Sequence, residues 1–170
     1  MLAQKDYKRR HDKACLNLHM TLCRKYSLEV SEKWYQHKVD SVVENKSLKI
    51  QWDFNIQTDQ EIKHRRPGIV VVNKEKNECT IIDVANPGDH NLAQKKFEKF
   101  DNYSELRLKV ARMWNKKMVV VLIIIGALGS VPNDLQSYLK QLDIPYDLNT
   151  LQHSVQLGTA NILRKVLSME

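Results

Sequence analysis

The spacing of apolar residues along the chain alternates between a helical and an extended repeat. Residues 5–26 contain no Gly or Pro, and apolar side chains recur every four positions at Ala14, Leu18, Leu22 and Tyr26. This spacing predicts an amphipathic helix. From residue 49 to residue 59 the period falls to two, with polar residues between Ile50, Trp52, Phe54 and Ile56. That alternation predicts a strand with one buried face.

Two β-branched runs follow, at residues 68–73 and 79–84, with a polar stretch between them. Such a pair predicts a β-hairpin. A two-residue turn at Glu75-Lys76 sets the register and pairs Gly68 with Asp83 across the ladder. We therefore expect these two positions to be direct cross-strand neighbours.

The second half of the chain predicts one long helix, one strand and two further helices. Residues 91–115 lack Gly and Pro and carry apolar residues on one helix face, so a helix begins near Asn91. The continuous β-branched run 119–125 is typical of a strand buried on both faces. Helices are expected from Ser130-Val131-Pro132 to about Leu142 and at 151–167, where Gly158 interrupts the pattern. The order α-β-β-β-α-β-α-α indicates an α/β fold, with a mixed sheet flanked by helices on both faces.

Composition narrows the class of protein. A chain of 170 residues with 42% hydrophobic residues can bury one core, so we expect a single domain over residues 1–170. An excess of 27 Lys and Arg over 20 Asp and Glu gives a net charge of +7 and favours a polyanionic partner. The longest apolar run, 118–125, is far shorter than the roughly 20 residues of a membrane span, so no membrane partner is expected. The charged N-terminal region predicts no secretory signal. Three widely spaced cysteines favour reduced thiols and a nuclear or cytoplasmic location.

Asp83 is the most unusual polar residue, because it lies within the apolar run of its strand. An unpaired carboxylate there would carry a large desolvation penalty. It is either a strand-end carboxylate satisfied by Arg65, Arg66 or solvent, or a catalytic or metal-binding group.

A row of possible zinc ligands occurs on the first predicted helix at His11, Cys15, His19 and Cys23, each four residues after the last. Ligands at this spacing can share one ion in pairs. The row as a whole covers about 18 Å of helix, because each residue adds about 1.5 Å. All four therefore cannot enclose one zinc ion, and we expect buried thiols and a histidine on the helix face.

The order of several short motifs resembles a known nuclease family. Arg10-His11-Asp12, Arg66-Pro67-Gly68, Ile82-Asp83-Val84 and Glu98-Lys99 with Tyr103 occur in this order. The set resembles the restriction-like endonuclease domain of site-specific non-LTR retrotransposon polyproteins, a member of the PD-(D/E)XK superfamily. The resemblance covers residues 7–142 and implies an αβββαβ core, with 143–170 as a C-terminal helical extension. It also implies nicking of target DNA for reverse transcription in the intact element. Because 170 residues leave no room for a reverse transcriptase, we expect a fragment, a relic or a domesticated copy.

The resemblance also assigns residues. It implies that Asp83 is the second motif carboxylate and a ligand of Mg²⁺, and that Lys99 is the catalytic lysine displaced onto the following helix, with Lys95 and Lys96 as alternatives. Gly68 stands where the family has its first Asp. Since Mg²⁺ is held by carboxylate oxygens, this substitution predicts impaired cleavage. Carboxylates elsewhere offer substitutes that the hairpin register does not place, namely Glu44, Asp53, Asp59 and Asp89.

DNA is the partner that the resemblance and the charge both favour. The basic residues expected to contact it are Lys8, Arg9, Arg10, Arg65, Arg66, Lys95 and Lys96. Two other functions remain open: a nucleic-acid-binding module without cleavage, and a remnant with a role in protein interaction or structure. The sequence leaves the oligomeric state open.

Overall fold

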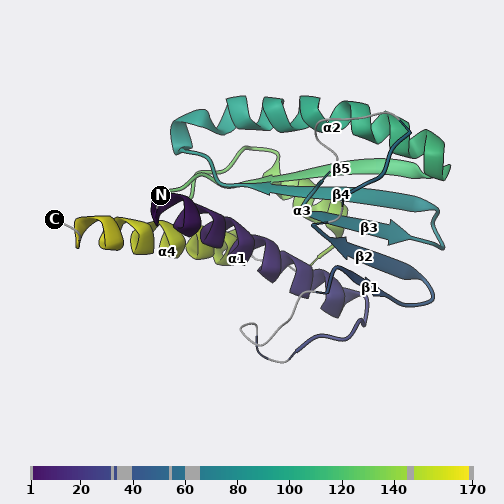
Figure 1. Cartoon of the computed structure of the whole chain (residues 1–170), viewed down its shortest axis with the longest axis horizontal. Helices are drawn as coiled ribbons and strands as arrows, with labels where there is room; N and C mark the ends of the chain where they lie inside the picture. The colour runs from purple at the N-terminus through teal and green to yellow at the C-terminus, as the bar shows by residue number, and fades with distance from the viewer. Residues whose placement is uncertain are drawn as a thin grey trace.

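The computed structural model describes residues 2–31, 33, 40–53, 55–59, 66–144 and 148–168. In chain order the elements are α1 (Leu2–Lys25), β1 (Val42–Glu44), β2 (Leu48–Trp52), β3 (Ile69–Asn73), β4 (Glu78–Ala85), the short 3₁₀ helix η2 (Asp89–Asn91), α2 (Leu92–Trp114), β5 (Lys117–Ile124), α3 (Leu135–Leu142) and α4 (Leu148–Leu167). Figure 1 shows the strands as one sheet with helices around it.

The described strands form one mixed sheet in the order β1-β2-β3-β4-β5. Strands β1 to β4 are antiparallel neighbours, whereas β5 is parallel to β4 and reaches it through α2. The β4–β5 ladder runs from the pair Glu78 and Lys117 to the pair Ala85 and Ile124. A parallel pair needs such a crossover, because a tight turn can only reverse the chain direction.

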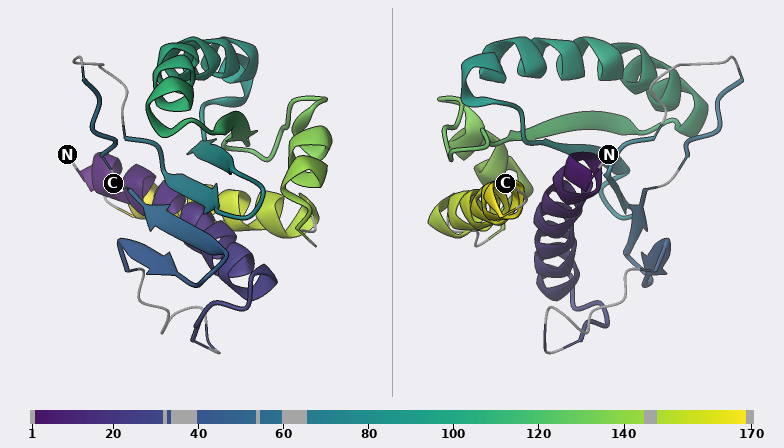
Figure 2. Two further views of the ribbon diagram at one scale, coloured as in Figure 1. Left: turned by 90° about the vertical axis from the view of Figure 1, so that its right-hand side faces the viewer. Right: turned by 60° about the vertical axis from the view of Figure 1, so that its left-hand side comes forward.

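Helices cover both faces of the sheet, as Figure 2 shows. One face packs against α1, α3 and α4 through side chains such as Leu18, Leu139 and Leu151. The other face packs against α2 through Leu106 and Val110. The predicted α/β class with a mixed, two-sided sheet is therefore confirmed. Among the described residues, no helix combines the length and the apolar character needed to cross a membrane.

Two features of the first strands differ from the prediction. The edge strand β1, only three residues long, was not predicted, since so short a segment carries no alternating pattern. Strand β2 ends at Trp52 rather than near residue 59, because Asp53 adopts a left-handed conformation with φ of 46°. Ile56 is nevertheless buried, on the α2 side of the sheet. Phe54, predicted for the same strand, lies outside the described residues.

The predicted register of the β3–β4 hairpin is confirmed. Ile69 faces Ile82 and Asn73 faces Glu78, as the predicted register requires. The β3–β4 ladder ends at Ile69, so Gly68 lies one residue before β3 begins. The turn, however, spans residues 74–77 rather than two residues. The longer turn is held at its ends, because the Asn73 side chain accepts the Lys76 N–H at 2.9 Å and Asn77 takes a left-handed φ of 50°.

Helix α4 continues through Gly158, which lies where this helix packs against α1. A Cβ atom built at Gly158 would be 2.6 Å from Cγ of Arg10, closer than atoms can approach. The two helices run antiparallel, since Asp6 pairs with Lys165 while Arg10 bonds to Thr159. The extension after residue 142 thus shares the core, with Leu151 and Val155 in the same hydrophobic cluster as α1.

The three buried, unbridged cysteines make stability sensitive to alkaline pH. Burial raises the pKa of Cys23 to about 11 and that of Cys79 to about 12, from 9.0. We predict that the free energy of unfolding falls as pH rises above about 9, because the unfolded chain then loses thiol protons that the folded chain keeps. Each such thiol contributes a slope of about 1.4 kcal/mol per pH unit.

Urea unfolding under reducing conditions at about pH 8 and about pH 10 measures this loss. The Cys79→Ala variant is the control, and its stability should fall less between the two pH values. An equal fall in both proteins would contradict the assignment of the effect to buried thiols.

Candidate functional site

The carboxylate of Asp83 is buried in the sheet and paired with a lysine from helix α2, which covers one face of the sheet. Asp83 lies near the carboxyl end of β4 with 6% of its surface exposed. Its Oδ2 atom is 2.8 Å from Nζ of Lys99, which projects from the second turn of α2. Of the partners considered from the sequence, Arg66 instead pairs with Asp53 at 2.8 Å, and Arg65 lies outside the described residues.

The negative charge of Asp83 affects the pKa of two neighbouring side chains, Tyr103 and Cys15. The Tyr103 hydroxyl donates a hydrogen bond to the carboxylate, and burial, followed by the negative charge of Asp83, raises the pKa of Tyr103. Burial also raises the pKa of the Cys15 thiol, with Asp83 as the next cause, while Lys99 acts in the opposite direction. Asp83 and Lys99 therefore form the charged centre of a group drawn from β4, α2 and α1.

Position 68 is open to a side chain. A Cβ atom built at Gly68 would have the Ile82 carbonyl oxygen at 3.6 Å and Cys15 Sγ at 3.9 Å, which are ordinary contacts. Of the described glycines, Gly129 alone has a positive φ. The backbone at position 68 therefore does not require glycine.

The residues present do not fit the Mg²⁺ ion that the family resemblance implies. Asp83 supplies one carboxylate, and in the described parts of the chain no group of three His, Cys, Asp or Glu side chains could hold a metal ion. The possible substitutes are engaged elsewhere: Glu44 pairs with Lys74, Asp53 pairs with Arg66, and Asp89 accepts the N–H groups of Leu128 and Ser130. Asp59, the fourth, belongs to no such group either.

Arg10 and His11 hold the backbone where β4 ends. Arg10 donates to the carbonyl oxygen of Asn86 at 3.0 Å and to the hydroxyl of Thr159 at 2.7 Å. His11 Nε2 lies 3.0 Å from the carbonyl oxygen of Val84. Arg10 is only 7% exposed, and this burial lowers its pKa. It therefore differs from Lys8 and Arg9, the other cations that we expected on the same DNA-binding surface, which are exposed.

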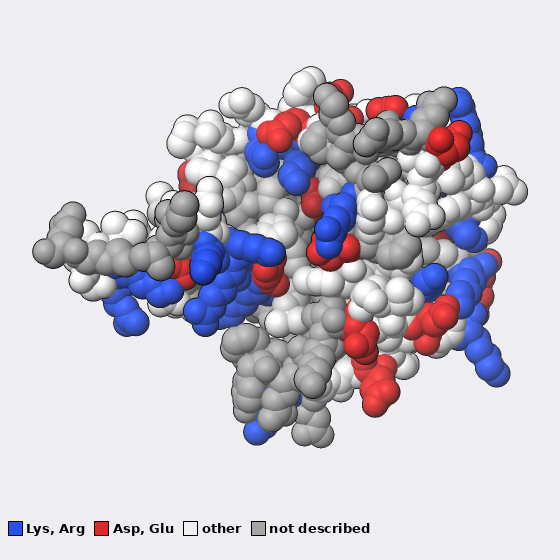
Figure 3. Space-filling view, in the orientation of Figure 1, with Lys and Arg blue, Asp and Glu red and all other residues white. Residues whose placement is uncertain are grey.

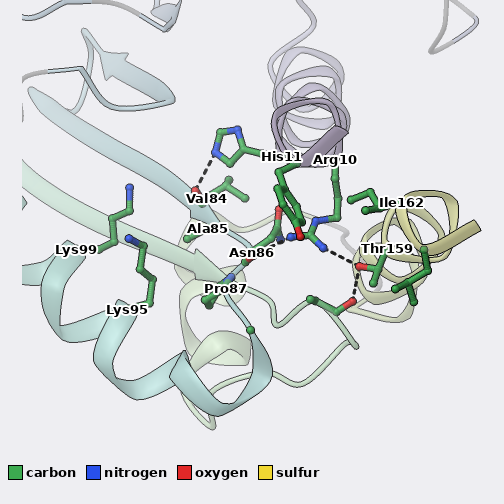
Figure 4. A pocket seen from close by; sticks show the side chains of 14 residues that line it. Arg10, His11, Val84, Ala85, Asn86, Pro87, Lys95, Lys99, Thr159 and Ile162 are labelled. Carbon is green, nitrogen blue, oxygen red and sulfur yellow. Dashed lines mark hydrogen bonds between the residues drawn. The ribbon is translucent and has the colours of Figure 1, made fainter. Parts of the chain in front are cut away.

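A cavity of about 530 Å³ opens beside these groups. Figure 4 shows the side chains that line it. Its walls include Arg10 and His11 from α1, Lys95 and Lys99 from α2, and Thr159 from α4. The cationic groups of Arg10, Lys95 and Lys99 are suited to binding an anion. The structure thus brings Lys95 and Lys99 to one cavity, whereas Lys96 pairs with Asp134.

The histidines and cysteines of α1 form two pairs rather than one group. Cys15 Sγ lies 3.7 Å from His11 Nε2, and Cys23 Sγ lies 3.7 Å from His19 Nδ1. The expected burial of the thiols is confirmed. His19 is also fully buried and packs against Trp52 in a T-shaped arrangement, with ring centres 5.5 Å apart.

Sequence reasoning missed the contribution of α4 and of Asn86 to this site. The Arg10–Thr159 bond joins residues 149 positions apart, which no local pattern reveals. The available signal was Gly158, a glycine within a helical pattern, because such a residue often marks close packing of helices.

We predict that Lys99→Met lowers the free energy of unfolding by about 2 to 3 kcal/mol, because it leaves the Asp83 carboxylate buried without a counter-charge. The double variant Asp83→Asn, Lys99→Met should recover most of this loss. Chemical denaturation near neutral pH measures all three proteins.

Lys95→Met is the matched control for the same experiment. It removes the same charge from the same helix, but the pair that Lys95 forms with Glu98 is more exposed and should contribute less than about 1 kcal/mol. Equal losses from Lys95→Met and Lys99→Met would show that the Asp83–Lys99 pair has no special energetic role.

No protein-family model matches this chain, and no curated protein matches it in sequence. The geometry of the site and the motifs of the sequence are therefore the basis for its function.

Proposed function

We propose that this chain is a retrotransposon-derived, endonuclease-like domain that binds DNA and does not cleave it at a measurable rate. In an intact element such a domain nicks target DNA for reverse transcription. The single observation that carries the proposal is the Asp83–Lys99 pair at 2.8 Å. Gly68, where the family has its first Asp, lies one residue before the β3–β4 ladder begins. The elements around the pair support it, since α1, β2, β3, β4, α2 and β5 follow the αβββαβ order of PD-(D/E)XK nucleases once the three-residue edge strand β1 and the short η2 are set aside.

The missing carboxylate is the reason for the lack of cleavage. Nucleases of this class use Mg²⁺ to activate water and to stabilise charge on the phosphate. Loss of one ligand carboxylate is expected to cost about 10² to 10⁴ in rate, because metal coordination supplies several kcal/mol of transition-state stabilisation. Position 68 provides no such ligand here, so no metal-dependent step is assigned to the chain as it stands.

A non-catalytic nucleic-acid-binding module is the second candidate function. The observation that favours it is the cavity with Arg10, His11, Lys95 and Lys99 in its walls, which needs no metal to attract a phosphate. The two candidates differ in ancestry and in the effect of a carboxylate restored at position 68. In the endonuclease-like domain the remaining groups still form a cleavage site that lacks one residue, so the carboxylate would restore cleavage. In a binding module without that ancestry it would not.

We predict that Gly68→Asp produces Mg²⁺- or Mn²⁺-dependent nicking of plasmid DNA, and that the starting chain shows none. We expect the variant to fold, because a Cβ atom at position 68 makes only ordinary contacts, and a thermal melt verifies this. Gly68→Asn is the matched control, because it adds a side chain of the same size without the charge.

Nicking by Gly68→Asp should vanish in the Gly68→Asp, Asp83→Ala double variant. A folded Gly68→Asp protein without nicking would favour the binding module over the nuclease ancestry. Nicking by the starting chain that survives both Asp83→Ala and Lys99→Ala would place a cleavage site elsewhere in the molecule.

We also predict weak, sequence-independent binding to duplex DNA with a strong dependence on salt. If about four phosphates are contacted, log affinity should fall with log salt with a slope of about −3.6, at roughly −0.9 per phosphate. The double variant Lys8→Ala, Arg9→Ala should flatten this slope by about one to two units. Anisotropy titrations at several salt concentrations measure it, and the absence of any slope would argue against a nucleic-acid partner.

A further inference from the structure

A groove of about 810 Å³ lies between α1 and α4, next to the cavity at the end of β4. Arg10 and Ile162 line both spaces, so the groove and the cavity adjoin each other. Figure 3 shows Lys and Arg side chains gathered over these two helices. The groove belongs in part to the C-terminal helix, for which the family resemblance gave no function.

The packing of the two helices fixes the shape of the groove. Gly158 lets the α4 backbone approach the stem of Arg10, and the Lys165–Asp6 ion pair at 2.6 Å joins the helices one to two turns away. The Arg10–Thr159 hydrogen bond adds a further tie. These contacts hold the walls in place before any ligand arrives, which reduces the entropy lost on binding.

The charge of the groove is strongly one-sided. Among the described residues that line it, seven are cationic and two are acidic: Lys5, Lys8, Arg9, Arg10, Lys13, Arg164 and Lys165 against Asp6 and Asp12. Both carboxylates already have cationic or imidazole partners, since Asp6 pairs with Lys165 and Asp12 lies 3.2 Å from Nδ1 of His11. A concave surface of one sign concentrates the electrostatic potential and favours a ligand with regularly spaced opposite charges.

We infer that the groove between α1 and α4 binds the sugar–phosphate backbone of a nucleic acid, with Arg164 and Lys165 contributing from the C-terminal helix. A strand in the groove would lead into the cavity lined by Lys95 and Lys99. This inference rests on the proposed function and adds to it a path for the strand. It also gives the extension after residue 142 a direct part in binding.

The test compares two pairs of substitutions that remove equal charge from opposite faces of the sheet. Arg164→Gln, Lys165→Gln alters the groove, and Arg107→Gln, Arg112→Gln alters exposed positions on α2. The salt slope of binding to a labelled DNA duplex of about 20 base pairs should flatten by about 0.9 to 1.8 in the groove variant, at roughly 0.9 for each phosphate that the protein no longer neutralises. The lower figure applies if Lys165 stays with Asp6 in the complex. The slope should change little in the α2 variant. Arg164→Lys, Lys165→Arg keeps both charges and should keep the slope.

The outcomes separate the inference from the proposed function. If the unaltered chain binds DNA with a salt slope and the groove variant keeps that slope, the inference fails while DNA binding stands. Equal flattening in the groove and α2 variants would also overturn it, because binding would then be diffuse. No binding by the unaltered chain would remove both proposals.

Two further ligands identify the source of the phosphates. An RNA duplex of the same sequence should show the same loss in the groove variant, because the protein binds the backbone, and the tighter of the two duplexes names the preferred partner. Vesicles with anionic lipid are the other arm. If they bind more tightly than either duplex and are released by the Arg164→Gln, Lys165→Gln change, the groove serves a membrane surface and the inference is wrong.

Discussion

The parallel pairing of β4 with β5 is the constraint on which the arrangement of the molecule depends. The two strands are buried on both faces along most of their length, so each face needs a layer of helices to cover it. The connection between them supplies α2 on one side, and α1, α3 and α4 supply the other. At its carboxyl end β4 therefore emerges between two helical layers. Lys99 reaches Asp83 from one layer, and Arg10 and His11 reach the next carbonyl groups from the other.

The parts of this arrangement that depend on local sequence were predictable. The β-branched runs on either side of the hairpin turn fixed the register, although the turn proved longer than expected. Two helical patterns without Gly or Pro placed α1 and α2 within a few residues of their observed ends. Strand β1 escaped prediction because three residues give no periodicity, and the end of β2 depends on the backbone conformation of Asp53.

The site itself was predictable only in part, because its residues meet through tertiary packing. The order of motifs named Asp83 and Lys99 as residues of one site, and the structure places their charged atoms 2.8 Å apart. The burial of Arg10 could not be predicted from the sequence, where it is one of three consecutive cations. Its partners come from the loop after β4 and from a helix near the other end of the chain. A helical charge pattern cannot distinguish a cation with such partners from one in solvent.

The surroundings of position 68 differ from those of Asp83 in a way that bears on how the gene changes with time. Substitution of one member of a buried ion pair is destabilising, because it leaves the other charge buried without a partner. Position 68 has no such constraint, since a Cβ atom there makes only ordinary contacts and the backbone has no unusual φ. Every glycine codon becomes a codon for Asp or Glu by a single G-to-A transition at its second base. An acidic residue at position 68 is therefore one point mutation away in either direction. Under the proposed nuclease ancestry, position 68 is therefore the place where an acidic residue can be gained or lost without breaking a buried ion pair, unlike Asp83 and Lys99.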